Sequence, residues 1–334
     1  MKTFELTGGF GIDKLAMADR PAPVPGHGQA LIKMRAWSLN YRDLMMVRGQ
    51  YNPKLPLPFQ TLSDGVGDVV AVGEGVTRVK PGDRVAGAFM QAWIEGGNDD
   101  AKSKSALGGA IPGLAAEQVV LDQNGLVHVP AHLTDEEAAT LPCAAVTAWN
   151  ALVSSGGLKA GDTVLVQGTG GVSLFALQFA KMIGARVIAT SSSDAKLERV
   201  RALGASDTIN YKSTLNWGRA VRDLTGGMGV DHVVEVGGAG TLPQSMQAVS
   251  TGGRISLIGV LTGGQIDPMG LLMKNITLQG IFVGSRAMFE DMNRAIALHQ
   301  MRPVVDRVFA FSDYPKALAH LESGAHFGKV VLKV

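Results

Sequence analysis

The sequence predicts an α/β protein in two parts, a doubly wound parallel sheet of six strands and a small β-rich barrel. The chain has 334 residues, which is more than a single hydrophobic core usually serves. From residue 163 onward, short β-branched runs alternate with amphipathic helical stretches. This alternation is typical of parallel strands joined by crossover helices. Before residue 123 the pattern is instead one of short strands broken by turns, which favours a small barrel.

The first part contains three clear strand candidates. Residues 30–37 follow the turn-rich PAPVPGHG, residues 65–72 run into a glycine turn, and residues 84–88 follow a Pro-Gly-Asp turn. Residues 94–112 are polar and rich in glycine, and they lack any metal-ligand pattern. We expect an exposed loop there.

The middle of the chain changes to helical signals. Thr134 precedes three acidic residues and is expected to cap a helix, and the helical pattern of residues 138–152 is interrupted at Pro142. The strands of the sheet are then predicted at residues 163–167, 185–191, 207–211, 230–236, 254–259 and 276–283. Helices are predicted at 194–203, 215–224, 288–299 and 314–322, with further strands at 304–311 and 329–334. The last segments are expected to return to the first part.

Composition excludes several classes of function. Lys plus Arg is 31 and Asp plus Glu is 29, so no general attraction to nucleic acid or to acidic membranes is expected. The single cysteine, Cys143, excludes an internal disulfide framework. No apolar run reaches bilayer length, and the N-terminus lacks the apolar core of a signal peptide. We therefore expect a cytoplasmic enzyme that acts on a small molecule.

One stretch, TVLVQGTGGV at residues 163–172, carries the strongest functional signal. A short apolar strand runs into clustered glycines and then into a mostly apolar helix. Glycines let the chain turn tightly and bring backbone N–H groups against a pyrophosphate. The sixth position of the glycine pattern is Ser173, so the pattern alone is weak, but the six alternating strands support it. A dinucleotide is therefore predicted to bind at Gly168, Thr169, Gly170, Gly171 and Val172.

The chain also resembles a known family over nearly its whole length. The resemblance rests on LNYRDLMMVRGQY (39–51), SDGVGDVVAVGEGVTRVKPGDRV (63–85), LPCAAVTAWNAL (141–152), VQGTGGV (166–172) and HFGKVVL (326–332). These segments are similar to the medium-chain dehydrogenase/reductases, in particular to the zinc-lacking quinone-reductase-like or alcohol-dehydrogenase-like members.

The resemblance implies an architecture. A Rossmann dinucleotide-binding domain at 144–282 is expected to be inserted into a GroES-like catalytic domain formed by 1–143 and 283–334. The active-site cleft is expected between the two domains. The resemblance further implies a homodimer, with residues 276–284 near the two-fold axis.

The zinc ligands of the family are replaced in this chain. Asn40 stands where zinc alcohol dehydrogenases have a cysteine, and Ser63 stands where they have a histidine. Only Cys143 remains at a ligand-like position, and residues 96–109 contain no cysteine for a structural zinc. An amide and a hydroxyl are poor zinc ligands, so we predict that no zinc is bound.

The end of the second strand of the sheet indicates which dinucleotide is used. NAD-preferring enzymes place an acid there, about 20 residues after the glycines, but this chain has Ser191 and Ser192. Lys196 follows, and it and Tyr211 match residues beside the adenosine phosphate in quinone reductases. We expect NADPH rather than NADH, and we expect Asp194 to cap the next helix. The alternative for Lys196 is an ordinary solvated helix lysine.

Without zinc, hydrogen-bond donors must stabilise the charge that develops in a hydride transfer. The candidates are Asn40, Tyr41, Arg42 and Tyr51, with Tyr41 as the first choice for a proton donor. Each has an ordinary structural alternative. Tyr41 could pack at a strand end, and Arg42 could pair with Asp43 or Asp64.

Further cofactor contacts are expected around the dinucleotide. Thr147 matches a threonine that contacts nicotinamide in the family, although its hydroxyl could instead bond its own helix. The glycines that follow the fourth and fifth strands have no side chain and could leave room for the cofactor. In similar proteins, residues of the C-terminal segment close the cofactor site. These residues are Gly237, Gly238, Gly259, His326 and Lys329.

The function predicted from the sequence is the NADPH-dependent reduction of a quinone or another activated carbonyl compound. A zinc-type alcohol dehydrogenase is the alternative within the same class, and Asn40 and Ser63 disfavour it. A nucleotide-binding protein without turnover, such as a crystallin-like or regulatory NADPH binder, is the alternative in a different class.

Overall fold

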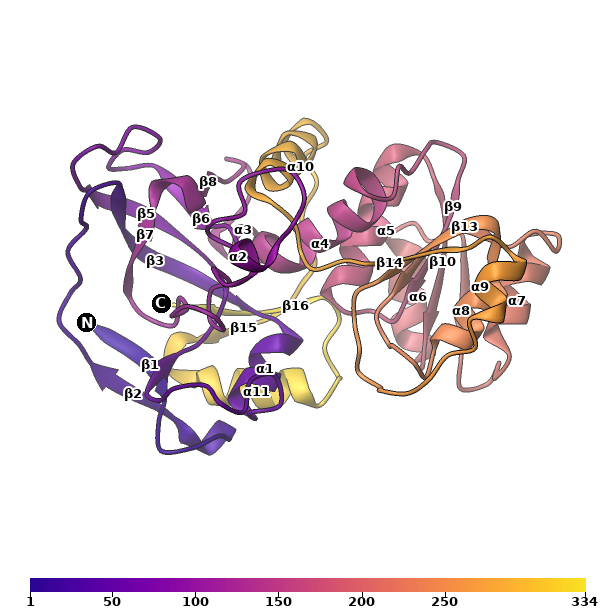
Figure 1. Ribbon diagram of the computed structural model, residues 1–334, viewed down its shortest axis with the longest axis horizontal. Coiled ribbons are helices and arrows are strands. Elements are labelled where there is room, and N and C mark those ends of the chain that lie inside the picture. Colours follow the sequence, from indigo (N-terminus) through magenta and orange to yellow (C-terminus); the bar gives the residue numbers. More distant parts are fainter. The chain divides into compact units, whose positions relative to one another are not determined.

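The computed structural model describes residues 1–334, which form two units (Figure 1). Unit 1 comprises Met1–Val146 and Gly284–Val334, and unit 2 comprises Thr147–Val283. Unit 2 is therefore one continuous segment, and unit 1 is built from the two ends of the chain. None of the helices combines the length and the hydropathy that a membrane span requires.

Unit 2 contains the predicted six-stranded sheet. Its strands are β9 (Thr163–Gln167), β10 (Arg186–Ser191), β11 (Asp207–Asn210), β12 (Val230–Glu235), β13 (Val249–Leu257) and β14 (Thr277–Gly280). All neighbours are parallel, in the order β11-β10-β9-β12-β13-β14. The strand order reverses between β9 and β12, and ligands of doubly wound sheets bind at the carboxyl ends of the strands at such a point. The prediction of a doubly wound sheet is confirmed.

The helices of unit 2 bury the central strands. They are α5 (Gly171–Ile183), α6 (Asp194–Ala202), α7 (Trp217–Leu224), α8 (Leu242–Ala248) and α9 (Met269–Met273). Helix α5 packs on β9 and β10, and α7 packs on α8. The core side chains Leu165, Ile188 and Val233 are fully buried, as expected for strands covered on both faces.

Unit 1 is organised around one long strand, β3 (Gln29–Leu39), which pairs with β5, β7 and β16. The seven-stranded sheet also contains β15, β6 and β8, and a second sheet has the order β2-β1-β4. The strands are β1 (Lys2–Leu6), β2 (Leu15–Asp19), β4 (Phe59–Gln60), β5 (Asp64–Val72), β6 (Arg84–Gly87), β7 (Gln118–Asp122), β8 (Leu126–His128), β15 (Val305–Ala310) and β16 (Lys329–Lys333).

The core of unit 1 joins the two ends of the chain. Trp37 of β3 is fully buried and stacks on Phe311, with ring centroids 4.2 Å apart. Its indole nitrogen donates a hydrogen bond to the carbonyl of Leu114 at 2.5 Å, so the polar atom of this large side chain is satisfied. The helices are α1 (Tyr41–Val47), α2 (Asp100–Ser103), α3 (Asp135–Ala138), α10 (Arg286–Leu298) and α11 (Tyr314–Glu322), with 3₁₀ turns at Ile12–Lys14, Gln123–Gly125 and Phe311–Asp313.

Two stretches of unit 1 differ from the sequence prediction. The expected exposed loop at 94–112 is exposed at 95–100, but residues 106–109 are buried, and Ala106 forms a β-bridge with Met90. Tyr41 does not end a strand but begins helix α1. The first difference involves a pairing with Met90 outside the segment, whereas α1 starts through a local contact, in which the Asp43 carboxylate accepts from the amide of Asn40 at 2.7 Å.

The segment that leads from unit 1 into unit 2 is mostly helical but irregular, with a turn at residues 139–140. Thr134 caps α3 as predicted, since its hydroxyl accepts a hydrogen bond from the Glu137 amide at 3.3 Å. Leu141–Ala145 and Asn150–Ser154 are π-helical and flank α4 (Val146–Trp149). The irregularity begins beside Pro142, which cannot supply a backbone donor.

Candidate functional site

The turn after β9 has the geometry of a phosphate-binding turn. Gly168 has φ +70° and donates its N–H to the carbonyl of Thr190 at 2.8 Å. Gly170 has an extended backbone, and α5 begins at Gly171. A Cβ atom added to Gly168 or Gly170 would meet no atom within 4 Å. The turn and the first amides of a 13-residue helix therefore border open space, where an anion would be stabilised.

Ser173 has a structural role that explains its place in the glycine pattern. Its hydroxyl donates to the carbonyl of Gln167 at 2.6 Å, and the residue is buried. The helix is thereby tied back to the last residue of β9. A serine at this position closes the turn by a hydrogen bond, so the departure from glycine does not weaken the site.

A buried carboxylate organises the neighbouring loop and was not predicted from the sequence. Glu235, the last residue of β12, has 0% exposure. Its Oε1 accepts hydrogen bonds from the amides of Gly237 (2.8 Å) and Gly238 (3.1 Å) and from the hydroxyl of Thr241 (2.6 Å). These three donors fix the course of the loop that leaves β12.

The other oxygen of Glu235 connects this loop to the glycine turn. Oε2 accepts from Nε2 of Gln167 at 2.7 Å and from the hydroxyl of Ser245. Because Gln167 immediately precedes Gly168, one carboxylate fixes both loops at the point where the strand order reverses. Hydrogen bonds to a charged acceptor are stronger than neutral ones, so this edge of the sheet is held rigidly.

The three predicted glycines at this edge have packing reasons of their own. A Cβ at Gly259 would lie 2.0 Å from the carbonyl oxygen of Val236, and one at Gly237 would lie 2.4 Å from the hydroxyl of Thr241. Gly238 has φ +94°. Glycine is therefore required by the close approach of the loops to each other, before any cofactor is considered.

The residues predicted to select the dinucleotide gather at the ends of β10 and β11. Ser191 ends β10, and the amide of Tyr211 donates to its carbonyl at 3.1 Å. Ser192 is half-buried and Tyr211 is 40% exposed. Lys196 lies on the first turn of α6. No carboxylate ends β10, as the sequence indicated.

The cap of α6 differs from the prediction. Ser193 is the capping residue, and its hydroxyl accepts from the amide of Lys196 at 3.4 Å. Asp194 is the first residue of the helix, and its carboxylate accepts from Nδ2 of Asn210 at 2.8 Å. Serine and aspartate are both good caps. Ser193 is the cap because its backbone is extended, whereas Asp194 already belongs to the helix.

Four residues predicted to be catalytic lie on or near α1 in unit 1. Tyr41 and Tyr51 are 49% and 45% exposed, and Asn40 is 8% exposed. The guanidinium of Arg42 lies 5.4 Å from the Tyr51 ring centroid, and its Nη1 donates to a backbone carbonyl of the 104–111 segment at 2.8 Å. Arg42 thus stacks on an aromatic ring and anchors a loop, rather than pairing with Asp43 or Asp64.

Asn40 belongs to a buried polar cluster, formed with Ser63, Asp64 and Lys329. Nζ of Lys329 donates to Oδ1 of Asn40 at 2.5 Å, and Nδ2 of Asn40 donates to the Ser63 hydroxyl at 3.4 Å. The Ser63 hydroxyl in turn donates to Asp64 at 2.7 Å. The other oxygen of Asp64 accepts from the amide of Cys143 at 3.0 Å.

Lys329, predicted to close the cofactor site, is a buried residue of β16 in unit 1. It is 3% exposed, and its ammonium is held inside unit 1. His326 is half-buried in the same unit and makes an edge contact with His320, with ring centroids 6.5 Å apart. Thr147 is 3% exposed and begins unit 2.

The donor set at this cluster does not fit a catalytic zinc. The amide oxygen of Asn40 is already bonded to a cation, the Lys329 ammonium. Desolvation and the neighbouring Asp64 carboxylate raise the pKa of the Cys143 thiol well above its usual range. No group of three or more His, Cys, Asp or Glu side chains is placed to hold a metal ion.

Asp43 lies beside the cluster as a second buried acid. It has 0% exposure, its Oδ2 accepts from the amide of Asn40 at 2.7 Å, and its Oδ1 has no partner. Desolvation raises the pKa of Asp43 to about 6, against the opposing effect of the nearby Arg42. Burial likewise raises the pKa of Asp64, which the Lys329 ammonium partly offsets.

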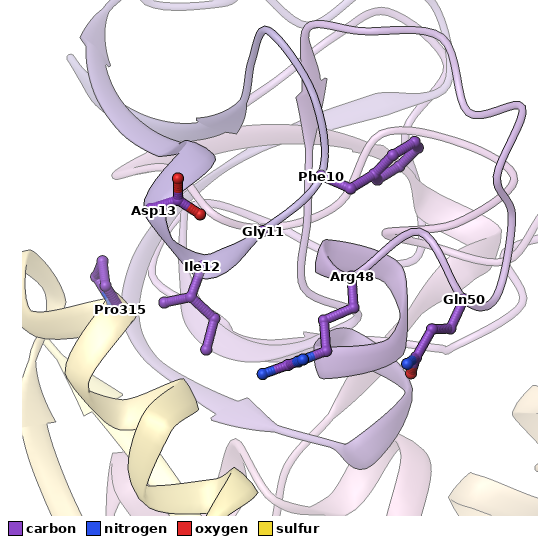
Figure 2. Close-up of a pocket in the computed structure, with 7 residues that line it drawn as sticks. All are labelled: Phe10, Gly11, Ile12, Asp13, Arg48, Gln50 and Pro315. Atoms are coloured by element: carbon purple, nitrogen blue, oxygen red, sulfur yellow. The ribbon is translucent and has the colours of Figure 1, made fainter.

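Two cavities, one in each unit, are not lined by the residues predicted to bind cofactor or substrate. A cavity of 640 Å³ in unit 1 is lined by residues of the 10–13 turn, by Arg48 and Gln50, and by Pro315 at the start of α11, as Figure 2 shows. Arg48 forms an ion pair with Glu322. A cavity of 270 Å³ in unit 2 includes Asp231 and His232, at the amino ends of the strands and so at the edge of the sheet opposite the glycine turn.

Comparison with known proteins places the chain in a family. Residues 26–131 match the alcohol dehydrogenase GroES-like domain, and residues 171–298 match the zinc-binding dehydrogenase domain. A zinc-type alcohol dehydrogenase-like protein of Schizosaccharomyces pombe is 46% identical over 333 residues, covering 97% of this chain and 96% of that protein. The chain belongs to the medium-chain dehydrogenase/reductase superfamily. It is therefore an oxidoreductase with a Rossmann domain and a GroES-like domain.

Other relatives within the superfamily carry different names. An acryloyl-coenzyme A reductase of Metallosphaera sedula is 30% identical over 321 residues, covering 93% of each chain. A quinone oxidoreductase of Lama guanicoe is 29% identical over 325 residues, covering 94% of this chain and 92% of that protein.

Solved structures of the superfamily show the same fold over the whole chain. A Sinorhizobium meliloti protein assigned as an alcohol dehydrogenase has a TM-score of 0.93 at 44% identity, covering 100% of this chain and 99% of its own. An NAD-dependent alcohol dehydrogenase gives 0.91 at 35%, with 100% of both chains covered. A mycobacterial protein complexed with NADPH gives 0.84 at 31%, also with 100% of both covered.

Proposed function

We propose that this member of the superfamily reduces quinones or α,β-unsaturated carbonyl compounds with NADPH and without a catalytic zinc. The observation that carries the proposal is the cluster at Asn40. Where the resemblance places two of the zinc ligands of alcohol dehydrogenases, this chain has the amide of Asn40 and the hydroxyl of Ser63, and the buried ammonium of Lys329 is bonded to that amide. The amide of Asn40 can donate a hydrogen bond to an oxygen that becomes negative, which is the need that zinc otherwise serves.

The residues of unit 2 would hold the cofactor. The backbone of Gly168–Val172 would bind the pyrophosphate at the start of α5, and Ser192, Lys196 and Tyr211 would surround the 2′-phosphate. NADPH supplies a hydride when it is bound. The mycobacterial relative complexed with NADPH supports this choice, and the NAD-dependent relative makes the coenzyme a necessary part of the test.

The residues of unit 1 would act on the substrate oxygen and on the proton. Reduction of an enone or a quinone leaves negative charge on a carbonyl oxygen, and an N–H of Asn40 would stabilise it. Tyr41, with its phenol half exposed, would deliver the proton. Arg42 keeps Tyr51 and the 104–111 segment in place through the contacts described above. The names of the acryloyl-coenzyme A reductase and quinone oxidoreductase relatives agree with an activated double bond as the target.

A screen of NADPH oxidation tests the proposal directly. The purified chain is mixed with quinones, enones, aldehydes and saturated ketones, each with NADPH and with NADH. We expect turnover with quinones or enones and a preference for NADPH. Turnover confined to primary or secondary alcohols and their carbonyl products would contradict the proposal, and tight NADPH binding with no turnover across the panel would favour a non-catalytic binder.

Treatment with a chelator distinguishes a reductase without zinc from a zinc-type alcohol dehydrogenase. After dialysis against a strong chelator, we expect unchanged activity and a zinc content, by elemental analysis, of less than about 0.1 ion per chain. Zinc dehydrogenases hold one catalytic ion per chain, so this limit is about a tenth of their content. One zinc per chain that is lost together with the activity would overturn this part of the proposal.

We also propose a homodimer, formed through the free edge of β14. This strand pairs only with β13 and ends the sheet. Large apolar side chains are exposed beside it, namely Met269, Leu272, Met273 and Phe282. An exposed edge next to apolar side chains is a ready interface. Light scattering after gel filtration would decide between a monomer of 35.0 kDa and twice that mass.

A further inference from the structure

Lys329 presents its ammonium to backbone and side-chain acceptors inside unit 1. Nζ lies 2.6 Å from the carbonyl oxygen of Leu39 and 2.5 Å from Oδ1 of Asn40. An ammonium group has only hydrogens to offer and no lone pair, so it always donates. The side chain of Asn40 must therefore turn its oxygen toward Lys329.

This contact removes the usual ambiguity of an amide side chain. The oxygen and nitrogen of an asparagine are nearly interchangeable in shape, and only their partners assign them. With Oδ1 fixed by Lys329, Nδ2 faces the hydroxyl of Ser63 at 3.4 Å. Ser63 uses its own hydrogen on Asp64 at 2.7 Å, so it offers Asn40 only lone pairs. In the series Lys329, Asn40, Ser63 and Asp64, each hydrogen bond therefore has only one possible donor.

Nδ2 of Asn40 donates toward the Ser63 hydroxyl and toward the neighbouring Asp64, whose pKa burial raises and the amide lowers. Asn40 retains 8% exposure, whereas Ser63, Asp64 and Lys329 are buried more deeply. The Asn40 amide, as the most exposed donor of the cluster, is therefore the group from which a substrate oxygen can accept a hydrogen bond. The charge behind the amide polarises it and makes its N–H a better donor.

We propose that Lys329 is a positioning residue, which locks the amide of Asn40 so that one N–H is directed at the substrate oxygen. The inference rests on the proposed function, because it assigns the fixed donor of that reaction. Burying an ammonium is costly. Here three groups offset the cost, namely the Leu39 carbonyl, the Asn40 amide and the Asp64 carboxylate, whose charge interacts with that of Lys329.

Two substitutions separate the lock from the donor. Asn40→Asp keeps the shape and the bond to Lys329, because a carboxylate accepts from an ammonium, but it removes the N–H. We expect kcat to fall by about 100-fold or more, as when one oxyanion donor is removed elsewhere. Lys329→Met keeps the length of the side chain and removes the ammonium that holds the Asn40 amide. We expect kcat to fall about tenfold or more, which corresponds to a loss of about 1.4 kcal/mol from the poorer orientation of the amide. The Kd for NADPH should stay within about twofold.

The control variants distinguish positioning from general stability. Lys329→Arg restores a cationic donor and should recover part of kcat. Lys333→Met changes an exposed lysine of the same strand, which pairs with Glu136, and should leave kcat unchanged. If Asn40→Asp retains kcat, or if Lys329→Met raises only the Kd for NADPH, the proposal is overturned.

A double-mutant cycle tests the lock even if no substrate is turned over. Failure of the wild-type chain in the substrate screen would refute the proposed function alone. The unfolding equilibria of Asn40→Ala, Lys329→Met and the double variant then measure the coupling between the two side chains. A coupling of about tenfold or more in the unfolding constant supports the lock, and independent effects refute it.

Discussion

Replacing Glu235 by glutamine would test whether one carboxylate holds both cofactor loops in order. Oε1 of the glutamine could still accept from the amides of Gly237 and Gly238 and from Thr241. The NH₂ group, however, would face Nε2 of Gln167, which is itself a donor. Ser245 could turn its hydroxyl to accept, so the essential loss is the bond to Gln167.

The size of the effect follows from burial. A hydrogen bond to a charged group contributes about 1.5–3 kcal/mol, and a buried donor left without a partner adds a similar desolvation cost. We therefore expect the free energy of unfolding to fall by about 2–4 kcal/mol. At about 2–4 °C for each kcal/mol in a chain of this size, Tm would fall by about 5–15 °C.

Thermal unfolding and cofactor titration together give the assay. The loop that follows β12 and the glycine turn after Gln167 lose their common anchor in Glu235→Gln. The Kd for NADPH, followed by its fluorescence, should therefore rise by about three- to tenfold, which is about 0.7–1.4 kcal/mol. Glu198→Gln is the matched control, because Glu198 is an exposed residue of α6 in the same unit. An unchanged Kd and a Tm within about 1 °C of the control would refute the role given to Glu235.

Two further predictions concern charge. The folded pKa of Asp43 is about 6 and its ordinary value is 3.8, so its stabilising contribution is complete below pH 3.8 and is lost as the pH rises through 6. At 1.36 kcal/mol for each unit of pKa, this loss is about 3 kcal/mol. The free energy of unfolding of Asp43→Asn, measured with urea, should therefore vary less between pH 4 and 7.5 than that of the wild-type chain. Parallel pH profiles of the two proteins would contradict the prediction. Ser192→Asp should lower kcat/KM with NADPH by about tenfold or more relative to NADH, because a carboxylate repels a 2′-phosphate, and an unchanged ratio would show that this serine does not face the phosphate.

The parts of the fold that follow from local patterns were predictable. The turn at Gly168–Gly171 joins an apolar strand to an apolar helix within a few residues, and its geometry depends on glycine φ angles and on the start of the helix. The alternation of strands and helices after residue 163 likewise depends on near neighbours. The prediction that Asn40 and Ser63 stand in place of zinc ligands likewise depends on single positions of the sequence.

The parts that were missed depend on residues far apart in the chain. Lys329 is 289 positions from Asn40, and no pattern around HFGKVVL indicates that its ammonium is buried. Glu235 ends an apolar strand, and at such a position the sequence predicts that a carboxylate faces solvent. Its five donors come from Gln167, Ser245 and the following loop, so only the parallel register of β9 and β12 brings them together.

The discontinuity of unit 1 determines the order in which a growing chain can complete its structure. Unit 2 is finished when residue 283 has been synthesised, and its sheet needs no residue from elsewhere. Unit 1 must wait for β16, which pairs with β3 across about 290 positions of sequence. Domains fold as units while the ribosome proceeds. A truncated chain that ends before Lys329 would therefore keep every residue of unit 2 but would lack the side chain that holds Asn40.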